Sequence, residues 1–129
     1  MGRRATNGPT QAELEILSIL WRRGPSTVRK VNEELNRQRP TGKTTTLKLM
    51  QIMRAKGLLE RDESVRPQVY CPTLSKERAQ GRLLHDLLER AFDGSAGQMA
   101  LRALATRKAS PKELAEIRRL LDEMERGSR

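Results

Sequence analysis

Aromatic residues are nearly missing from this chain of 129 residues, which has one Trp, one Tyr and one Phe. Its core must therefore be built from Leu, Ile, Met, Val and Ala, a composition that favours helices and argues against a β-sandwich. The length allows one domain, or one domain with an appendage. We predict a mainly α fold.

Cysteine is equally scarce, because Cys71 is the single example. One cysteine cannot form an internal disulfide, which agrees with a reducing compartment. Neither Cys71 nor His85, the one histidine, has a local partner for nucleophilic or metal chemistry. We expect a half-buried thiol and a surface imidazole, and we predict no enzyme activity, no metal and no cofactor.

Long apolar runs are missing too, and none approaches the ~18 residues that a membrane span needs. The pair Arg3–Arg4 is not followed by the apolar stretch of a secretion signal. We therefore expect a cytoplasmic protein that does not enter a membrane.

Acidic residues are outnumbered, with 16 Asp and Glu against 26 Lys and Arg, for a net charge of +10. Most of the excess lies in residues 1–73, which carry 14 basic and 7 acidic residues. This balance indicates a polyanionic partner, nucleic acid before membrane, although simple solubility is an alternative explanation.

Two short helices are predicted near the start of the chain, after a loose basic arm at residues 1–8. Thr10 and Glu13 have capping-box spacing, and apolar residues then recur at helical intervals up to a glycine and proline. Ser26 is a natural N-cap for the second helix, which fades at Asn36.

A third helix over residues 43–56 has two different sides. At 100° per residue, its apolar side contains Thr46, Leu49, Met50 and Met53, and its opposite, polar side contains Thr44, Lys48 and Gln51. A β-hairpin follows, with strands near 58–62 and 68–72 and a turn over 63–67. This order of elements is that of a winged helix-turn-helix, in which the third helix enters the DNA major groove.

The polar side of the third helix supplies the predicted DNA contacts. Gln51 and Lys48 suit adenine and guanine edges, and Thr44 suits a phosphate or a thymine methyl. Phosphate contacts are expected from residues beside this face and at the wing tip: Lys43, Thr45, Arg54 and Arg66. Ser26 and Thr27 could bind a phosphate through backbone N–H groups, with simple helix capping as an equal alternative.

Residues 74–129 are predicted to form three amphipathic helices, which are too few to enclose much core alone. A second copy of the chain is the economical partner, because a twofold dimer would bury both sets of stripes. The predicted dimer contacts are Leu83, Leu84, Leu87, Leu88, Phe92, Leu101, Leu104, Leu114, Ile117 and Leu121. Folding back onto the winged helix is the alternative. We therefore predict a DNA-binding domain over 1–73 and a helical dimerisation domain over 74–129.

Several segments carry a family resemblance that covers nearly the whole chain: Pro9–Trp21, Gly24–Val31, Gly42–Leu47 and Lys56–Asp62. They resemble the penicillinase-repressor family of BlaI/MecI-type regulators. The tail segments Phe92–Ser95 and Ala109–Leu114 resemble the family's dimerisation segment. The resemblance implies a homodimeric repressor that occupies dyad-symmetric operators through its third helix and is released by a signal.

The chain also departs from this family. Lys43 stands where many members carry an aromatic residue, so an operator cannot be carried over from a relative. The Asn–Phe cleavage pair of the antibiotic-resistance branch and the Cys-x-Cys motifs of the copper-responsive branch are both missing. We predict release by a regulatory protease that cuts between Gly97 and Ser110, with repression relieved only by dilution as the rival. Full-length protein that persists through induction would contradict cleavage.

The predicted function is therefore a homodimeric, sequence-specific repressor on a pseudo-palindromic operator, using the helix at 43–56 and the wing at 63–67. A winged helix can also serve as a protein-interaction or RNA-binding module, and that is the alternative. The cationic face of residues 43–54, together with a basic wing, favours duplex DNA. The sequence does not specify the operator, the controlled genes or the signal.

Overall fold

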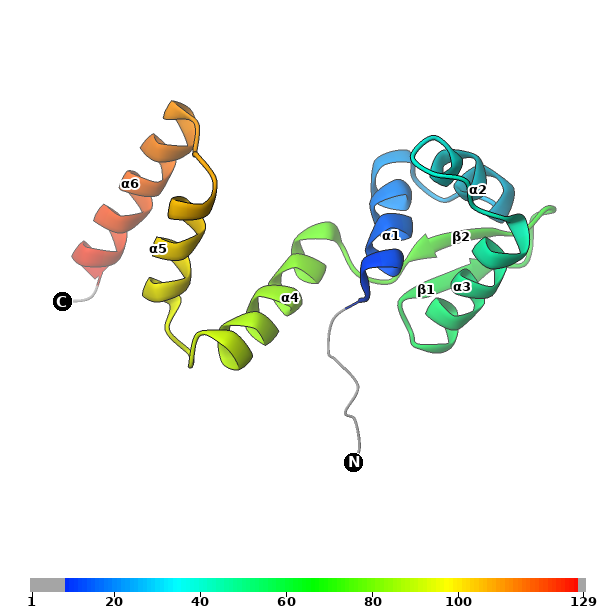
Figure 1. Cartoon of the computed structure of the whole chain (residues 1–129). Coiled ribbons are helices and arrows are strands. Elements are labelled where there is room, and N and C mark those ends of the chain that lie inside the picture. Colours follow the sequence, from blue (N-terminus) through cyan, green and yellow to red (C-terminus); the bar gives the residue numbers. More distant parts are fainter. Residues whose placement is uncertain (1–8, 128–129) are drawn as a thin grey trace. The chain divides into compact units, whose positions relative to one another are not determined.

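The computed structural model describes residues 9–127, so the arm predicted at 1–8 lies outside the described residues. The mainly α fold is confirmed (Figure 1), with helices α1 Gln11–Arg23, α2 Val28–Asn36, α3 Lys43–Ala55, α4 Lys76–Ala91, α5 Ala96–Thr106 and α6 Pro111–Gly127. Strands β1 Leu59–Asp62 and β2 Val69–Pro72 pair as one antiparallel hairpin. No helix within residues 9–127 is both long and apolar enough to cross a membrane.

In the first compact unit, which extends to Asp86, the first described helix is the capped one that the sequence predicts. The Thr10 hydroxyl accepts the Glu13 N–H at 3.2 Å, and the Glu13 carboxylate accepts the Thr10 N–H at 3.0 Å. Gly24 ends the helix with φ +89°, a conformation that side chains disfavour. Local sequence signals therefore set both ends of α1.

The prediction that Ser26 caps the second helix is wrong, because Thr27 does so. The Thr27 hydroxyl accepts the Lys30 N–H at 3.1 Å. Ser26 is buried one residue earlier and exchanges two backbone hydrogen bonds with Tyr70, at 3.1 and 2.8 Å. This bridge ties the segment before α2 to the hairpin, and it uses the Ser26 N–H that could otherwise bind a phosphate.

The core of the first unit lies between α1, α2, α3 and the hairpin. Thr46, Met50 and Met53 of α3 are fully buried, as the helical pattern predicts. Trp21 packs against the core, and its indole N–H donates to the Leu74 carbonyl at 2.9 Å. The buried apolar residues of this core are Ile16, Leu17, Ile19, Leu20, Val31, Leu35, Met50, Met53, Leu59 and Tyr70.

The hairpin starts immediately after α3. Gly57 has φ +83°, which lets the chain reverse so that the Leu58 N–H donates to the Met53 carbonyl at 2.8 Å. Each strand begins one residue later than predicted, and Arg61 pairs opposite Tyr70. The buried side chains of Leu59 and Tyr70 then hold the hairpin to the helices.

Along the chain, the first compact unit ends within α4 at Asp86, and the second begins at Leu87. The Ser75 hydroxyl caps α4 by accepting the Arg78 N–H at 3.1 Å. The start of α4 belongs to the first unit because Leu74 is bonded to Trp21 and Ala79 is buried. A division of function between 1–73 and 74–129 stays a prediction.

The second unit runs from Leu87 to the end of the chain. The α6 capping box is present, since Ser110 and Glu113 exchange hydrogen bonds of 2.9 and 3.1 Å. No residue of α5 or α6 is buried. The segment predicted for cleavage, 97–110, is mostly helix, because α5 continues to Thr106 and leaves only residues 107–110 between the two helices.

Candidate nucleic-acid interface

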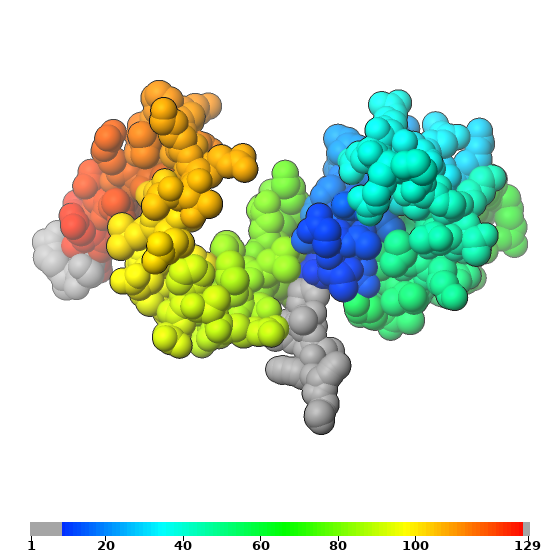
Figure 2. Space-filling view, in the orientation of Figure 1, coloured from blue at the N-terminus to red at the C-terminus, as the bar shows by residue number. Residues whose placement is uncertain are grey.

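The polar side of α3 faces solvent. Thr44, Lys48 and Gln51 are all exposed, and so are Lys43 and Thr45 beside them. The reverse side of the helix is locked into the core, so this polar side is the one available to a partner. In Figure 2 the turquoise residues of α3 form part of the outer surface of their unit. Contacts from these residues to DNA stay predictions.

Two exposed apolar side chains on α3 were not predicted as part of the interface. Leu47 is 39% exposed and Ile52 is 45% exposed. At 100° per residue they lie on the two flanks of the polar side. Apolar groups at such positions can contact thymine methyl groups in the major groove. The helical pattern of the sequence could have identified both residues as exposed, since neither lies in the arc that packs against the core.

An amide network, buried at Asn32 and Thr46 and exposed at Asn36, fixes the turn that leads into α3. The Asn32 side-chain amide donates to the Thr41 carbonyl at 3.0 Å and to the Thr46 hydroxyl at 2.9 Å. Asn36 exchanges two bonds with Thr41, donating to its carbonyl at 2.9 Å and accepting its N–H at 3.0 Å. The Thr46 hydroxyl donates in turn to the Gly42 carbonyl at 3.2 Å. The network therefore sets the angle at which α3 leaves α2.

The other end of α3 is held by a pair of opposite charges. The Lys56 ammonium donates to both oxygens of the Glu13 carboxylate, at 3.0 and 2.8 Å. The Glu13 side chain is only 4% exposed, whereas that of Lys56 is 44% exposed. Removal of one partner of a buried pair leaves the other uncompensated, which is costly. Both ends of α3 are thus fixed to the first unit.

The wing is not basic, and the prediction of a basic wing is wrong. Its strands and turn carry two arginines against Glu60, Asp62 and Glu63. Arg61 donates to the Glu63 carboxylate, a hydrogen bond that lowers the pKa of Glu63 from its ordinary value. Hydrogen bonds from Ser64 lower the pKa of Asp62 in the same way. Both carboxylates are therefore ionised at neutral pH.

The same carboxylate also reaches α3. A guanidinium nitrogen of Arg54 lies 3.6 Å from the Glu63 carboxylate. Arg54, predicted to contact phosphate, is therefore already paired, while Arg66 in the wing turn is exposed. An open groove of about 520 Å³ runs between α3 and the first strand of the wing, lined by Gln51, Arg54, Ala55, Leu59, Glu60 and Arg61. The structure thus brings Gln51 and Arg54 together beside the wing.

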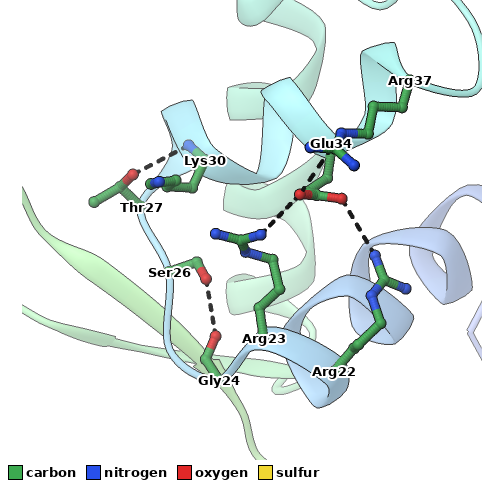
Figure 3. A network of polar contacts seen from close by, with 8 residues as sticks. All are labelled: Arg22, Arg23, Gly24, Ser26, Thr27, Lys30, Glu34 and Arg37. Carbon is green, nitrogen blue, oxygen red and sulfur yellow. Dashed lines mark hydrogen bonds and ion pairs between the residues drawn. The ribbon is translucent and has the colours of Figure 1, made fainter.

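The N-terminal end of α2 offers fewer free hydrogen-bond donors for a phosphate than predicted. Besides its bridged N–H, Ser26 donates its hydroxyl to the Gly24 carbonyl at 2.9 Å, as Figure 3 shows. Both of its donors are satisfied within the chain. Thr27 is half-buried and caps the helix. These bonds use the donors that Ser26 would offer a phosphate, and the phosphate contacts of Ser26 and Thr27 stay predictions.

The residues considered for catalysis or metal binding lie apart. Cys71 is half-buried on β2 and His85 is exposed on α4. Within residues 9–127 there is no group of three or more His, Cys, Asp or Glu side chains that could hold a metal ion.

Comparison with known proteins gives concordant results. The family model described as penicillinase repressor matches residues 9–123. The penicillinase repressor of Bacillus licheniformis is 25% identical, covering 88% of this chain and 89% of its own. The transcriptional regulator BlaI of Mycobacterium tuberculosis is 31% identical, covering 89% of this chain and 83% of its own.

A solved structure of a MarR family protein from Bacillus stearothermophilus is similar in fold. Its TM-score is 0.50 at 18% identity, covering 93% of this chain and 75% of that one. At this identity the likeness concerns the fold alone. With a family match that spans most of the described residues and a winged helix that presents a polar third helix, the chain belongs to the penicillinase repressor family and is a DNA-binding transcriptional regulator.

Proposed function

We propose that this protein is a homodimeric repressor that recognises a pseudo-palindromic operator, with α3 in the major groove and the wing along the backbone. The proposal rests on which side of α3 is exposed and on how both ends of the helix are held. Its polar residues Thr44, Lys48 and Gln51 are exposed, while its reverse side is buried and both of its ends are held by hydrogen bonds. A helix held this firmly can present base-reading groups in one fixed register.

The apolar surface of the second unit supports a dimer. Leu101 is 66% exposed, Leu121 53% and Met124 60%, although all three belong to amphipathic stripes. Large exposed apolar patches mark interaction surfaces. We propose that the partner is a second copy of the chain. A twofold axis would place the same apolar stripe of both copies face to face, and it would match the symmetry of a palindromic operator. Of the ten predicted dimer residues, Leu83, Leu88, Phe92 and Ile117 are already half-buried within one chain.

A dimer would raise the affinity of this small protein for an operator. Each winged helix contributes few contacts, so one half-site alone holds it weakly. Linking two winged helices makes the second contact intramolecular and raises occupancy through effective concentration. Half-sites are expected roughly one helical turn (~34 Å) or a multiple apart, so that both α3 helices reach one face of the duplex.

The experiment selects tight binders from a pool of random duplexes and then compares variants on the selected and random DNA. We expect the selected duplex to have dyad symmetry. Lys48→Ala and Gln51→Ala should each reduce the preference for it by roughly 1 to 3 kcal/mol if the contact is bidentate. Arg66→Ala should instead weaken binding to all duplexes and reduce the salt slope by about one.

Two outcomes would reject the proposal. If all three variants bound selected and random DNA more weakly by the same factor, α3 would not be reading bases. If RNA of the same sequence bound more tightly than DNA at the same salt concentration, the RNA-binding alternative would hold.

A further inference from the structure

Three arginines gather around one carboxylate on the side of the first unit formed by α1 and α2 (Figure 3). Arg23 approaches the Glu34 carboxylate at 2.8 Å and Arg22 at 3.3 Å, both from the last turn of α1. Arg37, which follows α2, lies 4.0 Å away. We call these four residues the Glu34 cluster.

The charges of the Glu34 cluster do not balance. Three guanidinium groups share one carboxylate, which leaves an excess of two positive charges. Glu34 is only 11% exposed, whereas Arg22, Arg23 and Arg37 are 58%, 38% and 77% exposed. One arginine would suffice to neutralise Glu34 and to join α1 to α2. The remaining cationic groups are thus held in place by Glu34 and turned toward solvent.

The position of the Glu34 cluster suits a phosphate. Glu34 lies in the first helix of the helix-turn-helix and Arg37 directly follows it, and this helix crosses the DNA backbone when the next helix lies in the groove. Figure 3 shows Lys30 on the same helix as Glu34, with Thr27 at the N-cap position before that helix. A guanidinium group presents its N–H donors in a planar fork that matches phosphate oxygens.

We propose that Arg22, Arg23 and Arg37 form a second phosphate-binding site, which holds the phosphodiester backbone of the DNA whose groove α3 reads. Glu34 is its positioning residue. The inference rests on the proposed function and adds a DNA-binding surface that neither the α3 face nor the wing includes. The competing explanation is structural: basic residues in the last turn of α1 favour its helix dipole and link it to α2.

The test uses the full chain with Arg22→Ala and Arg23→Ala combined. The matched control combines Lys112→Ala with Arg119→Ala, which removes the same charge from the exposed polar side of α6, opposite its leucine stripe. Binding is measured against salt on the selected duplex and on a random duplex. Phosphates whose ethylation weakens binding are mapped for the wild type and for each variant.

We expect the double variant to lower the salt slope by about 0.9 for each phosphate that it no longer neutralises, on both duplexes. If two phosphates are affected, the drop in affinity between 50 and 200 mM salt should be roughly tenfold smaller than that of the wild type. The double variant should also become insensitive to ethylation at particular phosphates. Arg22→Lys combined with Arg23→Lys should retain most of the salt slope, because it keeps both charges.

Two results would overturn this inference, and a different one would reject the proposed function. A double variant that keeps the wild-type slope and the wild-type ethylation pattern, with or without a decrease in thermal stability, would overturn this inference and favour the structural explanation. An equal decrease of slope in the α6 control would overturn it too, because the effect would then follow net charge. A wild type that binds no duplex more tightly than RNA would reject the proposed function itself.

Discussion

The two units contain similar amphipathic helices but use them differently. In the first unit Met53 lies on the apolar side of α3 and is completely buried, whereas Met124 lies on the apolar side of α6 and is 60% exposed. Both methionines belong to regular helical stripes. A stripe therefore shows which side of a helix must be covered, and it does not show whether the covering surface belongs to the same chain.

The difference follows from what each unit can pack together. The first unit combines three helices with a hairpin, and these elements meet around one core of ten buried apolar residues. The second unit has α5, α6 and the end of α4, and it buries no residue of α5 or α6. So few elements cannot surround a core. The first unit is expected to be stable by itself, and the second to depend on association.

The largest effect is expected from charge placed in the apolar stripes of the second unit. Leu101→Glu with Leu121→Glu should prevent dimerisation, because an ionised carboxylate is costly to bury. Affinity for the selected duplex should then fall by about 10² to 10⁴, the usual gain from linking two binding modules. Sedimentation and a binding titration measure the two effects. Lys112→Glu is the control, since it changes the net charge equally on the polar side of α6.

If the double variant remained dimeric and bound as tightly as the wild type, the second unit would have to be covered in another way. The exposed stripes of the second unit would then not be the dimer interface that we infer from the comparison of the two units.

The second-largest effect is the loss of stability expected when the buried Met53, but not the exposed Met124, is replaced by alanine. Met53→Ala should destabilise the first unit by about 2 to 5 kcal/mol, because it opens a cavity in a closed core. Met124→Ala should change the stability of that unit by less than about 0.5 kcal/mol, as exposed substitutions do. Urea unfolding followed by the fluorescence of Trp21, the single tryptophan, reports on the first unit alone. Equal destabilisation by both substitutions would contradict the difference in packing that we draw between the two units.

The smallest effect concerns charge near the proposed DNA surface. Glu63→Gln should strengthen binding to every duplex and steepen the salt slope by at most about 0.9, because a competing anion is removed from beside Arg54 and Arg61. Preference between sequences should not change. Glu116→Gln on α6 removes the same charge from the second unit and should leave the slope unaltered. A slope that shifts equally in both variants would mean that net charge alone governs binding.

Much of the candidate site could be predicted from the sequence. The spacing of Thr10 and Glu13 predicted the start of α1, and that of Ser110 and Glu113 predicted the start of α6. The period of 3.6 residues separated the buried side of α3 from its polar side. These features depend on residues close together in the chain, for which local hydrogen bonding and helix geometry are sufficient.

Other features could not be obtained this way. Ser26 looked like a cap because it follows Pro25, yet Tyr70, far along the chain, takes its backbone into a β-bridge. Likewise the charge of Arg54 looked available until the hairpin placed Glu63 beside it. In each case the competing partner came from another element, and sequence spacing carries no information about it.

The sequence by itself determined the helices, their apolar sides, the hairpin and the family. The tertiary structure decided which apolar sides are covered, at which residue the chain divides into two units, and which arginines are paired. The physical reason is that helix formation follows interactions over three or four residues, whereas burial and ion pairing depend on surfaces brought together from distant segments. The excess charge around Glu34 is of this second kind, because α1 and α2 create it only when they pack.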